Sequence, residues 1–496
     1  MNPIKNIVVV GGGTSGLIAA LYLKTFLSAK VRVVKSNSIG IIGVGEGTTE
    51  HWDTFIQDVG INKFDCIVKT EATVKIGIYF KDWNFKNHSY VHSIDYEDDI
   101  SPKASTHEIY NIAVQNTPKN PYNLSSTFKD IYLKNNIPLT QDLSSSNQYH
   151  FDTFKLNNYL LNECIKRNIS ITDATIENVN QDEKGNITSL ITSDKTQIKG
   201  DFFVDCSGFK RILSSKLGSK WKSYKDYLPM NRAITLSTDL NLDKGIETYT
   251  TTTSLSSGWA WKIPTQSRYG NGYVFNDNYI SSDKALDEFN KHLKTNKEES
   301  VKDIKFSAGK IDKFWINNCV SIGLSSGFSE PLEAQSIGFG IIQSQQLLQY
   351  FKSYQISPNK KSIINSYNNT LNEVYNQIID YVQLHYFTQR KDTPFWKEKL
   401  FKVTDFNKET FSQFKYGVFL PSYFKPHNMF SSKNFYQVYY GLGILNKATL
   451  NLNKSISPKP NLNPFYQEEY NKIYASKWNS ISHIDYLKLI KENQSL

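Results

Sequence analysis

The chain has 496 residues, 39% hydrophobic and 21% charged, so it can bury a large core and lacks the composition of a disordered or fibrous protein. No stretch approaches the ~18 consecutive apolar residues of a membrane helix, and Cys66, Cys164, Cys206 and Cys319 form no C-x-x-C pair, so neither a membrane span nor a disulfide or zinc framework is expected. The 57 basic and 47 acidic residues give a net charge of +10, but no basic block stands out, so no nucleic-acid partner is expected.

The first residues predict the opening βαβ unit of a dinucleotide-binding fold. Residues 5–10 predict a buried strand that includes a β-branched apolar run, residues 17–24 carry apolar side chains at helical spacing, and residues 31–34 predict a second strand. The first run is followed by glycines and a helix rather than by a small-residue cleavage site. We therefore expect no signal peptide and a cytoplasmic location.

Glycines between the first strand and the helix follow the G-x-G-x-x-G spacing. Gly11 permits a tight turn, Gly13 lets the backbone approach a pyrophosphate, and Gly16 lets the helix pack closely on the strand. The N–H groups at the start of the helix favour a phosphate. The acidic residue that usually contacts the ribose is replaced by Lys35, so Ser36 or another residue must make this contact.

Residues 73–80 alternate between apolar and polar side chains, which predicts one continuous strand. Val74, Ile76 and Ile78 would share the face that packs into the core. Lys75 would then point to the opposite face, where a closed pocket would desolvate its ammonium group in part.

The remaining pattern predicts further strands followed by a helical end. The elements expected in chain order are short strands over 171–206, a strand over 259–264, a buried strand over 319–324, and helices over about 336–354 and 362–390. Trp259 and Trp261 would share one face of their strand. Residues 101–148 are rich in Ser, Asn, Lys and Pro, and are expected to form surface excursions.

Short segments in this order resemble the flavin-dependent halogenases of the tryptophan-halogenase type. They are 11–16 (GGGTSG), 42–48 (IGVGEGT), 75–80 with Trp83, 149–152 (YHFD), 205–209 (DCSGF), 259–264 (WAWKIP), 330–333 (EPLE), 385–386 (HY) and 392–396 (DTPFW). The W-x-W-x-I-P segment is much more specific than the glycines. Any one of these segments could arise by chance, but their ordered combination is improbable.

The resemblance implies an α/β fold. It consists of a Rossmann-like FAD-binding core of the flavoprotein-monooxygenase type, an interleaved substrate-binding sheet and a helical C-terminal region. We expect the core to span 1–355, with substrate-binding segments at about 81–148 and 215–300, and the helical region to span 356–496.

The resemblance also implies the residues that bind FAD and halide. The cofactor-binding residues are Gly11, Gly12, Gly13, Thr14, Ser15, Gly16, Ser36, Ile39, Ile42, Glu46, Gly47, Ile176, Leu324 and Ile337. The halide would be bound by the backbone N–H groups of Gln335 and Ser336. Because Ala334 replaces the usual serine, bromide or iodide is expected to be preferred over chloride.

Two residues are implied to carry the chemistry. Lys75 would hold hypohalous acid, formed from O2 and halide with reduced FAD, or would react with it to give a haloamine. Glu333 would act as the general base that removes a proton from the halogenated ring. His92, Trp259 and Trp261 would line the substrate pocket and the route to it, and no metal site is expected.

The expected substrate is a small electron-rich aromatic molecule such as an indole or a phenol. Ile94 replaces an aromatic residue of the family's pocket, and residues after about 400 match the family least, which argues against free tryptophan. Since one dinucleotide glycine turn is evident, a separate NAD(P)H-dependent flavin reductase would supply FADH2. A flavin-dependent aromatic hydroxylase and a non-catalytic flavin-binding scaffold stay open as alternatives, and so does a homo-oligomeric state.

Overall fold

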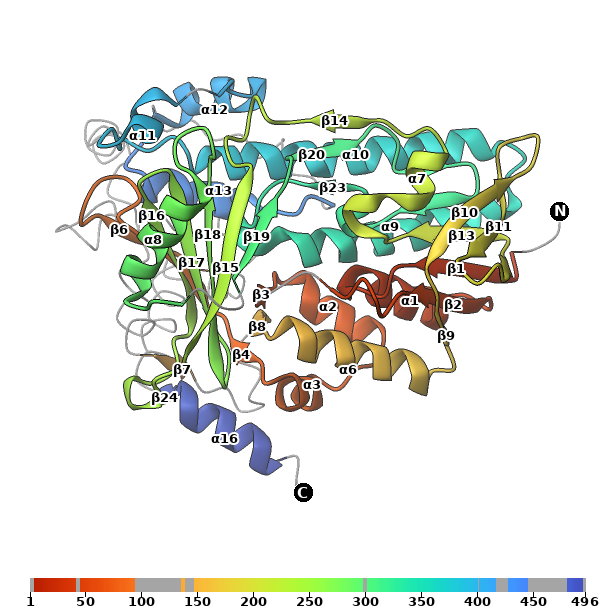
Figure 1. Cartoon of the computed structure of the whole chain (residues 1–496), viewed down its shortest axis with the longest axis horizontal. Coiled ribbons are helices and arrows are strands. Elements are labelled where there is room, and N and C mark those ends of the chain that lie inside the picture. Colours follow the sequence, from red (N-terminus) through yellow and green to blue (C-terminus); the bar gives the residue numbers. More distant parts are fainter. Residues whose placement is uncertain are drawn as a thin grey trace, which may run out of the picture. The chain divides into compact units, whose positions relative to one another are not determined.

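The structure is a computed structural model that describes residues 4–41, 45–93, 135–138, 147–297, 301–399, 401–415, 427–444 and 480–493. The chain forms two compact units whose segments alternate along the sequence (Figure 1). The first unit comprises Met1–Thr70, Phe151–Lys225 and Ser307–Asn376. The second unit comprises Glu71–His150, Asp226–Phe306 and Gln377–Leu496.

A six-stranded sheet organises the first unit, with the strand order β21-β22-β13-β1-β2-β9. Its strands are β1 (Asn6–Val10), β2 (Lys30–Lys35), β9 (Ser170–Asp173), β13 (Phe202–Asp205), β21 (Trp315–Ile316) and β22 (Cys319–Ser321). All neighbours pair in parallel except β21 and β22. Residues 7–10 of β1 are all buried, as expected for a parallel strand covered on both faces.

Helices and two small sheets complete the first unit. The helices are α1 (Thr14–Phe26), α2 (His51–Asp58), α3 (Lys63–Thr70), α6 (Thr153–Lys166), α7 (Ile212–Lys216), α9 (Gln335–Ile356) and the first part of α10 (Lys360–Leu384). The small sheets are β10 (Ile176–Gln181), β11 (Ile187–Thr192) and β12 (Gln197–Lys199), and β14 (Trp221–Ser223), β20 (Gly309–Ile311) and β23 (Gly327–Phe328). Residues 16–23 of α1 are all buried, because this helix packs against both α6 and α9 (Figure 1).

A seven-stranded sheet organises the second unit, with the strand order β19-β15-β18-β17-β16-β5-β6. Its strands are β5 (Gly77–Lys81), β6 (Ser89–Ser93), β15 (Arg232–Asp239), β16 (Tyr249–Leu255), β17 (Gly258–Pro264), β18 (Arg268–Phe275) and β19 (Lys302–Lys305). Helix α8 (Ser282–Leu293) covers one face of the sheet, where Phe289 packs with Ala260 and Tyr273 (Figure 1). The other face of β17 carries Trp259 and Trp261.

Short elements from distant parts of the chain complete the second unit. They are β4 (Thr73–Val74), β7 (Asn136–Pro138), β8 (Tyr149–Phe151), α11 (Pro394–Glu398), α12 (Asp405–Lys415), α13 (Ser432–Gly441), β24 (Ser480–Ser482) and α16 (His483–Asn493). β4 pairs with β8, and β7 pairs with β24. Within the described part of the chain, no helix is long and apolar enough to cross a bilayer.

The predicted continuous strand over 73–80 is wrong. β4 ends at Val74 and β5 begins at Gly77, so Lys75 and Ile76 lie in a break between two strands. The two strands belong to different sheets, since β4 pairs with β8 while β5 pairs with β16 and β6. Both alternating sets of side chains are buried near the break, so the pattern did not separate an inner from an outer face.

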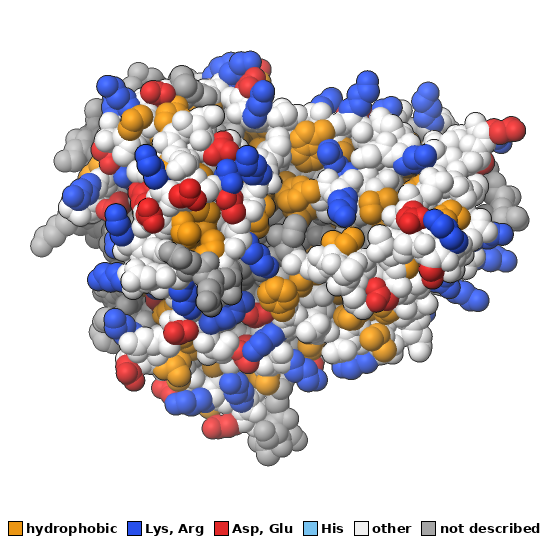
Figure 2. Space-filling view, in the orientation of Figure 1, with side chains coloured by type: hydrophobic (Ala, Val, Ile, Leu, Met, Phe, Trp, Pro, Cys, Tyr) orange, Lys and Arg blue, Asp and Glu red, His pale blue; other side chains and the backbone are white. Residues whose placement is uncertain are grey.

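The other predicted elements agree more closely with the structure. The strands at 5–10, 31–34 and 259–264 are confirmed as β1, β2 and β17. The two late helices are confirmed as α9 and α10, although α10 ends at Leu384. β22 ends at Ser321 and is followed by a 3₁₀ turn over Gly323–Ser325, and most of the predicted excursion over 101–148 lies outside the described residues. On the face in Figure 2, Lys and Arg side chains are interspersed with Asp and Glu rather than gathered in one patch.

Candidate functional site

The glycine turn of the first unit connects β1 to α1. A Cβ atom at Gly11 would lie 2.0 Å from the carbonyl oxygen of Cys206, and one at Gly16 would lie 2.0 Å from the carbonyl oxygen of Gly11. Gly11 also has a φ of +123°, which disfavours side chains. Close packing therefore requires glycine at both positions.

The space in front of α1 fits the pyrophosphate of a dinucleotide. Gly13 is the N-cap of α1, and a Cβ atom there would meet no other atom within 4 Å. The first turn of the helix carries no acidic residue and no side-chain cap. The first N–H groups of a helix lack intrahelical acceptors and favour an anion, so these residues fit a flavin dinucleotide.

The segment after β2 is hydrogen-bonded to a carboxylate on a neighbouring strand. Lys35 donates a hydrogen bond to Asn37, and the Ser36 hydroxyl lies 2.9 Å from that of Thr175. Asp173, at the end of β9, accepts a hydrogen bond of 2.9 Å from the backbone N–H of Asn37. The sequence analysis missed Asp173, which parallel pairing of β9 with β2 brings to the position beside Lys35.

The remaining predicted cofactor residues lie on several segments of the first unit. They are Ile39 in the loop after β2, Glu46 and Gly47 in β3 (Glu46–Gly47), Ile176 at the start of β10, Leu324 in the turn over Gly323–Ser325, and Ile337 in α9. Ile39 is 53% exposed, and burial raises the pKa of Glu46 to about 7. A Cβ atom at Gly323 would lie 2.5 Å from Oγ of Ser15, so the Ser15 side chain packs directly against this glycine. Ile42 is outside the described residues.

Glu333 lies in a strained turn between β23 and α9. Glu333 and Ala334 both have left-handed backbone angles, with φ values of +66° and +52°. Each such residue costs about 1–3 kcal/mol, and strain of this kind is concentrated at functional sites. The Glu333 side chain is only 5% exposed, so the strained turn directs a carboxyl group away from bulk water.

The side chain of Gln335 holds this turn from within. Its Nε2 atom donates hydrogen bonds to the carbonyl oxygens of Glu330 at 2.6 Å and Leu332 at 3.0 Å. Gln335 is 4% exposed, whereas Ser336 is exposed at the start of α9. The structure therefore brings the predicted base and the two predicted halide-binding residues together at one helix N-terminus in the first unit.

Lys75 is buried in the second unit, in the break between β4 and β5. It is 1% exposed, and its Nζ atom donates to Oε1 of Gln148 at 3.3 Å. Its backbone N–H donates to the carbonyl oxygen of Gln148 at 2.9 Å. The ammonium also acts on His150, because burial and then the charge of Lys75 lower the pKa of that imidazole. Lys75 thus lies close to a neutral amide and a neutral imidazole.

His92 and Trp261 lie on the same face of the seven-stranded sheet. Trp261 is opposite Thr252 of β16, and Thr252 is opposite Phe80 of β5. His92 of β6 is opposite Ile78, which precedes Phe80 by two residues. Because paired residues share a face and the side-chain period of a strand is two, this register brings the predicted substrate residues to one side.

The two tryptophans form an aromatic surface on this face. Their ring centroids are 5.9 Å apart, and Trp259 donates from Nε1 to the hydroxyl of Tyr386 at 3.2 Å. A Cβ atom at Gly272 would lie 2.1 Å from the Trp261 ring, so only glycine lets the indole lie flat on β18. Trp259 is 1% exposed and Trp261 is 8% exposed.

Residues near and after position 400 orient His92, although the resemblance is weakest there. Nδ2 of Asn434 lies 3.1 Å from Nε2 of His92, and Oδ1 of Asn434 accepts from the backbone N–H of Ser431 at 2.7 Å. Asn434 therefore donates to Nε2, which acts as the acceptor. The Tyr381 hydroxyl lies 3.3 Å from Nδ1. Neither Tyr381 nor Asn434 was found from the sequence, because no local pattern distinguishes them.

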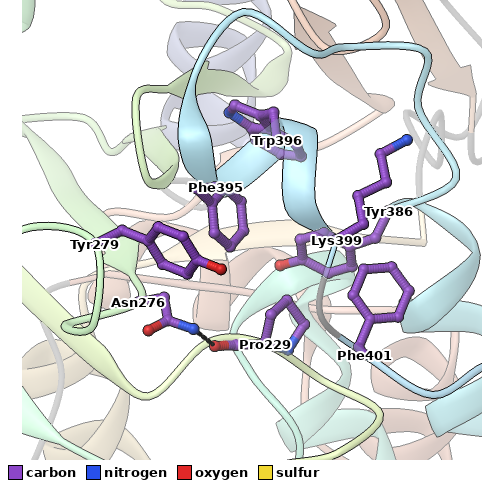
Figure 3. Close-up of a pocket in the computed structure, with 8 residues that line it drawn as sticks. All are labelled: Pro229, Asn276, Tyr279, Tyr386, Phe395, Trp396, Lys399 and Phe401. Carbon is purple, nitrogen blue, oxygen red and sulfur yellow. Dashed lines mark hydrogen bonds between the residues drawn. The ribbon is translucent and has the colours of Figure 1, made fainter.

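An aromatic pocket opens beside Tyr386 in the second unit (Figure 3). It is lined by Pro229, Asn276, Tyr279, Tyr386, Phe395, Trp396, Lys399 and Phe401. Asn276 donates to the Pro229 carbonyl at 2.7 Å, which braces one wall. Tyr386, which lines this pocket, also accepts the hydrogen bond from Trp259.

Comparison with known proteins places this geometry in a family. The sequence model of the family described as tryptophan halogenase matches residues 6–458. The 7-chloro-L-tryptophan 6-halogenase KtzR of Kutzneria sp. (strain 744) is 31% identical over 422 residues, which cover 79% of this chain and 81% of that protein. The tryptophan 6-halogenase ThaL of Streptomyces albogriseolus is 28% identical over 493 residues, which cover 90% and 91%.

Solved structures agree with this assignment. A flavin-dependent halogenase from Xanthomonas campestris superimposes with a TM-score of 0.86 at 26% identity, covering 99% of both chains. BrvH, a flavin-dependent halogenase from Brevundimonas sp. BAL3, superimposes with a TM-score of 0.85 at 25% identity, covering 98% of this chain and 99% of that one. The α/β fold predicted from the resemblance is thereby confirmed. The chain belongs to the tryptophan halogenase family and is a flavin-dependent halogenase.

Proposed function

We propose that this enzyme uses FADH2, O2 and a halide to halogenate small electron-rich aromatic substrates by way of hypohalous acid held at Lys75. The observation that carries this proposal is the burial of Lys75, whose ammonium contacts the amide oxygen of Gln148. A solvated surface lysine would be exposed, whereas Lys75 is buried in the break between β4 and β5. A buried ammonium is suited to hold one small polar molecule.

FAD would be held by the glycine turn of the first unit. The close approach at Gly11 and the open space at Gly13 support this assignment, and Ser36 with Asp173 would provide polar contacts to the ribose side. When bound in reduced form, the flavin would supply two electrons to O2 and so bring it to the peroxide oxidation level, which can take two more electrons from the halide. A separate NAD(P)H-dependent reductase would provide the reduced flavin, since the sequence has one evident dinucleotide glycine turn.

The halide would bind at the start of α9. Backbone N–H groups of Gln335 and Ser336 lie at a helix N-terminus whose first turn has no acidic residue, which favours an anion. The side chain of Gln335 is already used within the turn, so its backbone group would serve the halide. With Ala334 in place of the usual serine, we propose a preference for bromide or iodide, which are oxidised more readily than chloride.

Lys75 and Glu333 would divide the chemistry on the substrate. The Lys75 ammonium would donate a hydrogen bond to the oxygen of hypohalous acid and make its halogen more electrophilic. Alternatively, the free amine would take the halogen as the O–X bond breaks, giving a haloamine and releasing water. Glu333 would then accept the proton that leaves the ring carbon. The strained turn and the buried position of Glu333 support a role as a base held in one place.

The aromatic face of the second unit would bind the substrate. His92, Trp259 and Trp261 offer ring surfaces for stacking, and Asn434 fixes the orientation of His92. The named relatives include halogenases of tryptophan. For this chain we propose indoles or phenols instead, because Ile94 replaces an aromatic residue and the sequence after position 400 diverges most. Ile94 is outside the described residues.

The purified chain should be incubated with FAD, a flavin reductase, NADH and an aromatic panel, with chloride, bromide or iodide supplied separately. Mass spectrometry should show a halogenated product that requires added halide and forms fastest with bromide or iodide. A halide-independent hydroxylated product would identify a hydroxylase, and FAD binding without any product would identify a scaffold. Rapid reduction of bound flavin by NADPH without the reductase would contradict the need for a separate partner.

A further inference from the structure

We propose that His483, the first residue of α16, is a positioning residue that holds the backbone at Val74 and thereby fixes Lys75. The inference rests on the proposed role of Lys75. It concerns a residue 409 positions away from Val74 in the sequence, outside residues 6–458, which the sequence model of the family matches.

Three consecutive amide groups around the lysine donate to three different segments of the second unit. The N–H of Val74 donates to Nε2 of His483 at 3.0 Å. The N–H of Lys75 donates to the carbonyl of Gln148 at 2.9 Å, and the next N–H donates to the carbonyl of Thr248 at 2.7 Å. His483 is thus the one side chain among these three acceptors. No regular strand pairing spans this break, so these bonds determine where the backbone runs.

The hydrogen bond made by Nδ1 of His483 determines that Nε2 is an acceptor. Nδ1 lies 3.1 Å from the carbonyl oxygen of Ile246 and must donate to it, which leaves Nε2 as the acceptor. Burial lowers the pKa of His483 to about 4, so the ring is neutral near pH 7 and keeps this arrangement. The side chain is fully buried.

The start of α16 is itself well anchored. The backbone N–H of His483 donates to the carbonyl of Asn135 at 2.9 Å, and the preceding strand β24 pairs with β7. Tyr486, Leu487 and Ile490 are buried on the same helix. His483 is therefore held in place by contacts other than its bond to Val74, so it can fix the position of the lysine segment.

Loss of this acceptor would displace the lysine. A buried N–H group left without an acceptor is unfavourable, and a shift of the backbone toward another acceptor would relieve this cost. A misplacement of about 1 Å at a reacting group can reduce the rate by about 10²-fold. Hypohalous acid would still form, because its formation does not involve Lys75, but less of it would react at the lysine.

Two variants separate the two hydrogen bonds of His483. His483→Gln places an oxygen acceptor near the position of Nε2, so it keeps the hydrogen bond from the Val74 N–H. His483→Asn keeps a donor near the position of Nδ1 but loses the acceptor for the Val74 N–H. Ile490→Ala serves as the control for weaker docking of α16, since it removes buried apolar surface without touching either bond.

The assay measures how hypohalous acid is divided between two acceptors. Each variant is supplied with FAD, reductase, NADH, bromide, catalase, indole and free methionine, and the ratio of bromoindole to methionine sulfoxide is recorded. This ratio is a property of each folded molecule, so a smaller folded fraction does not change it. We expect the ratio to fall about 10- to 100-fold in His483→Asn, as a misplaced reacting group would, and to stay near wild type in His483→Gln and Ile490→Ala.

A wild-type ratio in His483→Asn would overturn the inference, and so would equal losses in His483→Asn and Ile490→Ala. The failure of the proposed function would look different. In that case Lys75→Ala itself would retain the wild-type ratio, whatever the His483 variants do.

Discussion

The glutamate turn of the first unit and the lysine segment of the second unit are held in place in opposite ways. Glu333 is positioned by its immediate neighbours, since Gln335 reaches back five residues to the Glu330 carbonyl. Lys75 is positioned by residues far away in the sequence, because Gln148 is 73 positions from it and His483 is 409 positions from Val74. One group proposed for catalysis is thus encoded locally, and the other depends on the assembled tertiary structure.

Because of this difference, substitutions around the two groups should have different effects on the reaction. A substitution in the glutamate turn should change the proton-transfer step and leave the handling of hypohalous acid unchanged. A substitution around the lysine segment should release hypohalous acid, even when it is made in the C-terminal helix.

The largest effect is expected from Lys75→Ala. Without the ammonium, bromination of indole by the enzyme should fall below detection, while methionine added as a scavenger is still oxidised. Lys75→Arg should also fail, because guanidinium is larger and does not form a haloamine readily. The matched control is Lys81→Ala, an exposed lysine of β5, which should brominate indole at the wild-type rate. Wild-type activity in Lys75→Ala would make the lysine dispensable.

Glu333→Gln should reduce turnover by about 10²–10⁴-fold, the usual contribution of a general base. The amide keeps the size of the side chain, so FAD binding measured by fluorescence titration should be unchanged. The ratio of bromoindole to methionine sulfoxide should stay near the wild-type value, because Lys75 should still hold the acid. An unchanged turnover number would remove Glu333 from the chemistry.

The pH dependence of stability should report on His483. Burial lowers its pKa to about 4 in the folded chain, against about 6.5 when unfolded, so the unfolded chain binds an extra proton between these values. The free energy of unfolding should therefore fall by about 3 kcal/mol as the pH drops from 6.5 to 4. The nearby charge of Glu247 opposes this shift, and His150, whose pKa burial also lowers, adds a loss in the same direction.

Denaturant titrations at pH 7, 5.5 and 4.5 would measure this loss in the wild-type chain and in His483→Gln. In His483→Gln, the loss of unfolding free energy at low pH that is due to His150 should remain, and the loss that is due to His483 should disappear. Identical pH profiles for the two proteins would show that His483 is not a buried neutral imidazole.

A smaller effect is expected from Gln335→Leu, which keeps the approximate volume but removes both hydrogen bonds inside the glutamate turn. The free energy of unfolding should fall by about 1–3 kcal/mol, because two buried carbonyl groups lose their donor. Turnover should fall about tenfold, which corresponds to 1.4 kcal/mol in the barrier. Gln349→Leu, an exposed position on α9, is the control, and equal losses in both variants would mean that Gln335 has no special role.

The same contrast explains what could be predicted from the sequence. The glycine turn and the turn before α9 are contiguous, and their geometry follows from residues within one or two helical turns. The alternation of Trp259 and Trp261 predicted their shared face correctly, because a strand period of two is local information. Gln335 was assigned only a backbone role, since its side-chain bonds depend on the left-handed residues before it.

The structure of the lysine segment could not be predicted in this way. The alternation over 73–80 predicted one strand, but both faces near the break are buried, and alternation cannot reveal a strand that changes sheets. Gln148, His483, Asn434 and Asp173 were missed because tertiary packing, not spacing, brings them to their partners. The resemblance located Lys75 without indicating what holds it.

In the proposed function, the enzyme rather than free hypohalous acid halogenates the substrate at Lys75. The most direct test adds a large excess of free methionine to the wild-type enzyme while it brominates indole, with reagent hypobromous acid and indole as the comparison. We expect methionine to suppress the reagent reaction but to leave the enzymatic yield of bromoindole unchanged. Equal suppression of both reactions would contradict the proposed function, because the electrophile would then have left the protein before meeting the substrate.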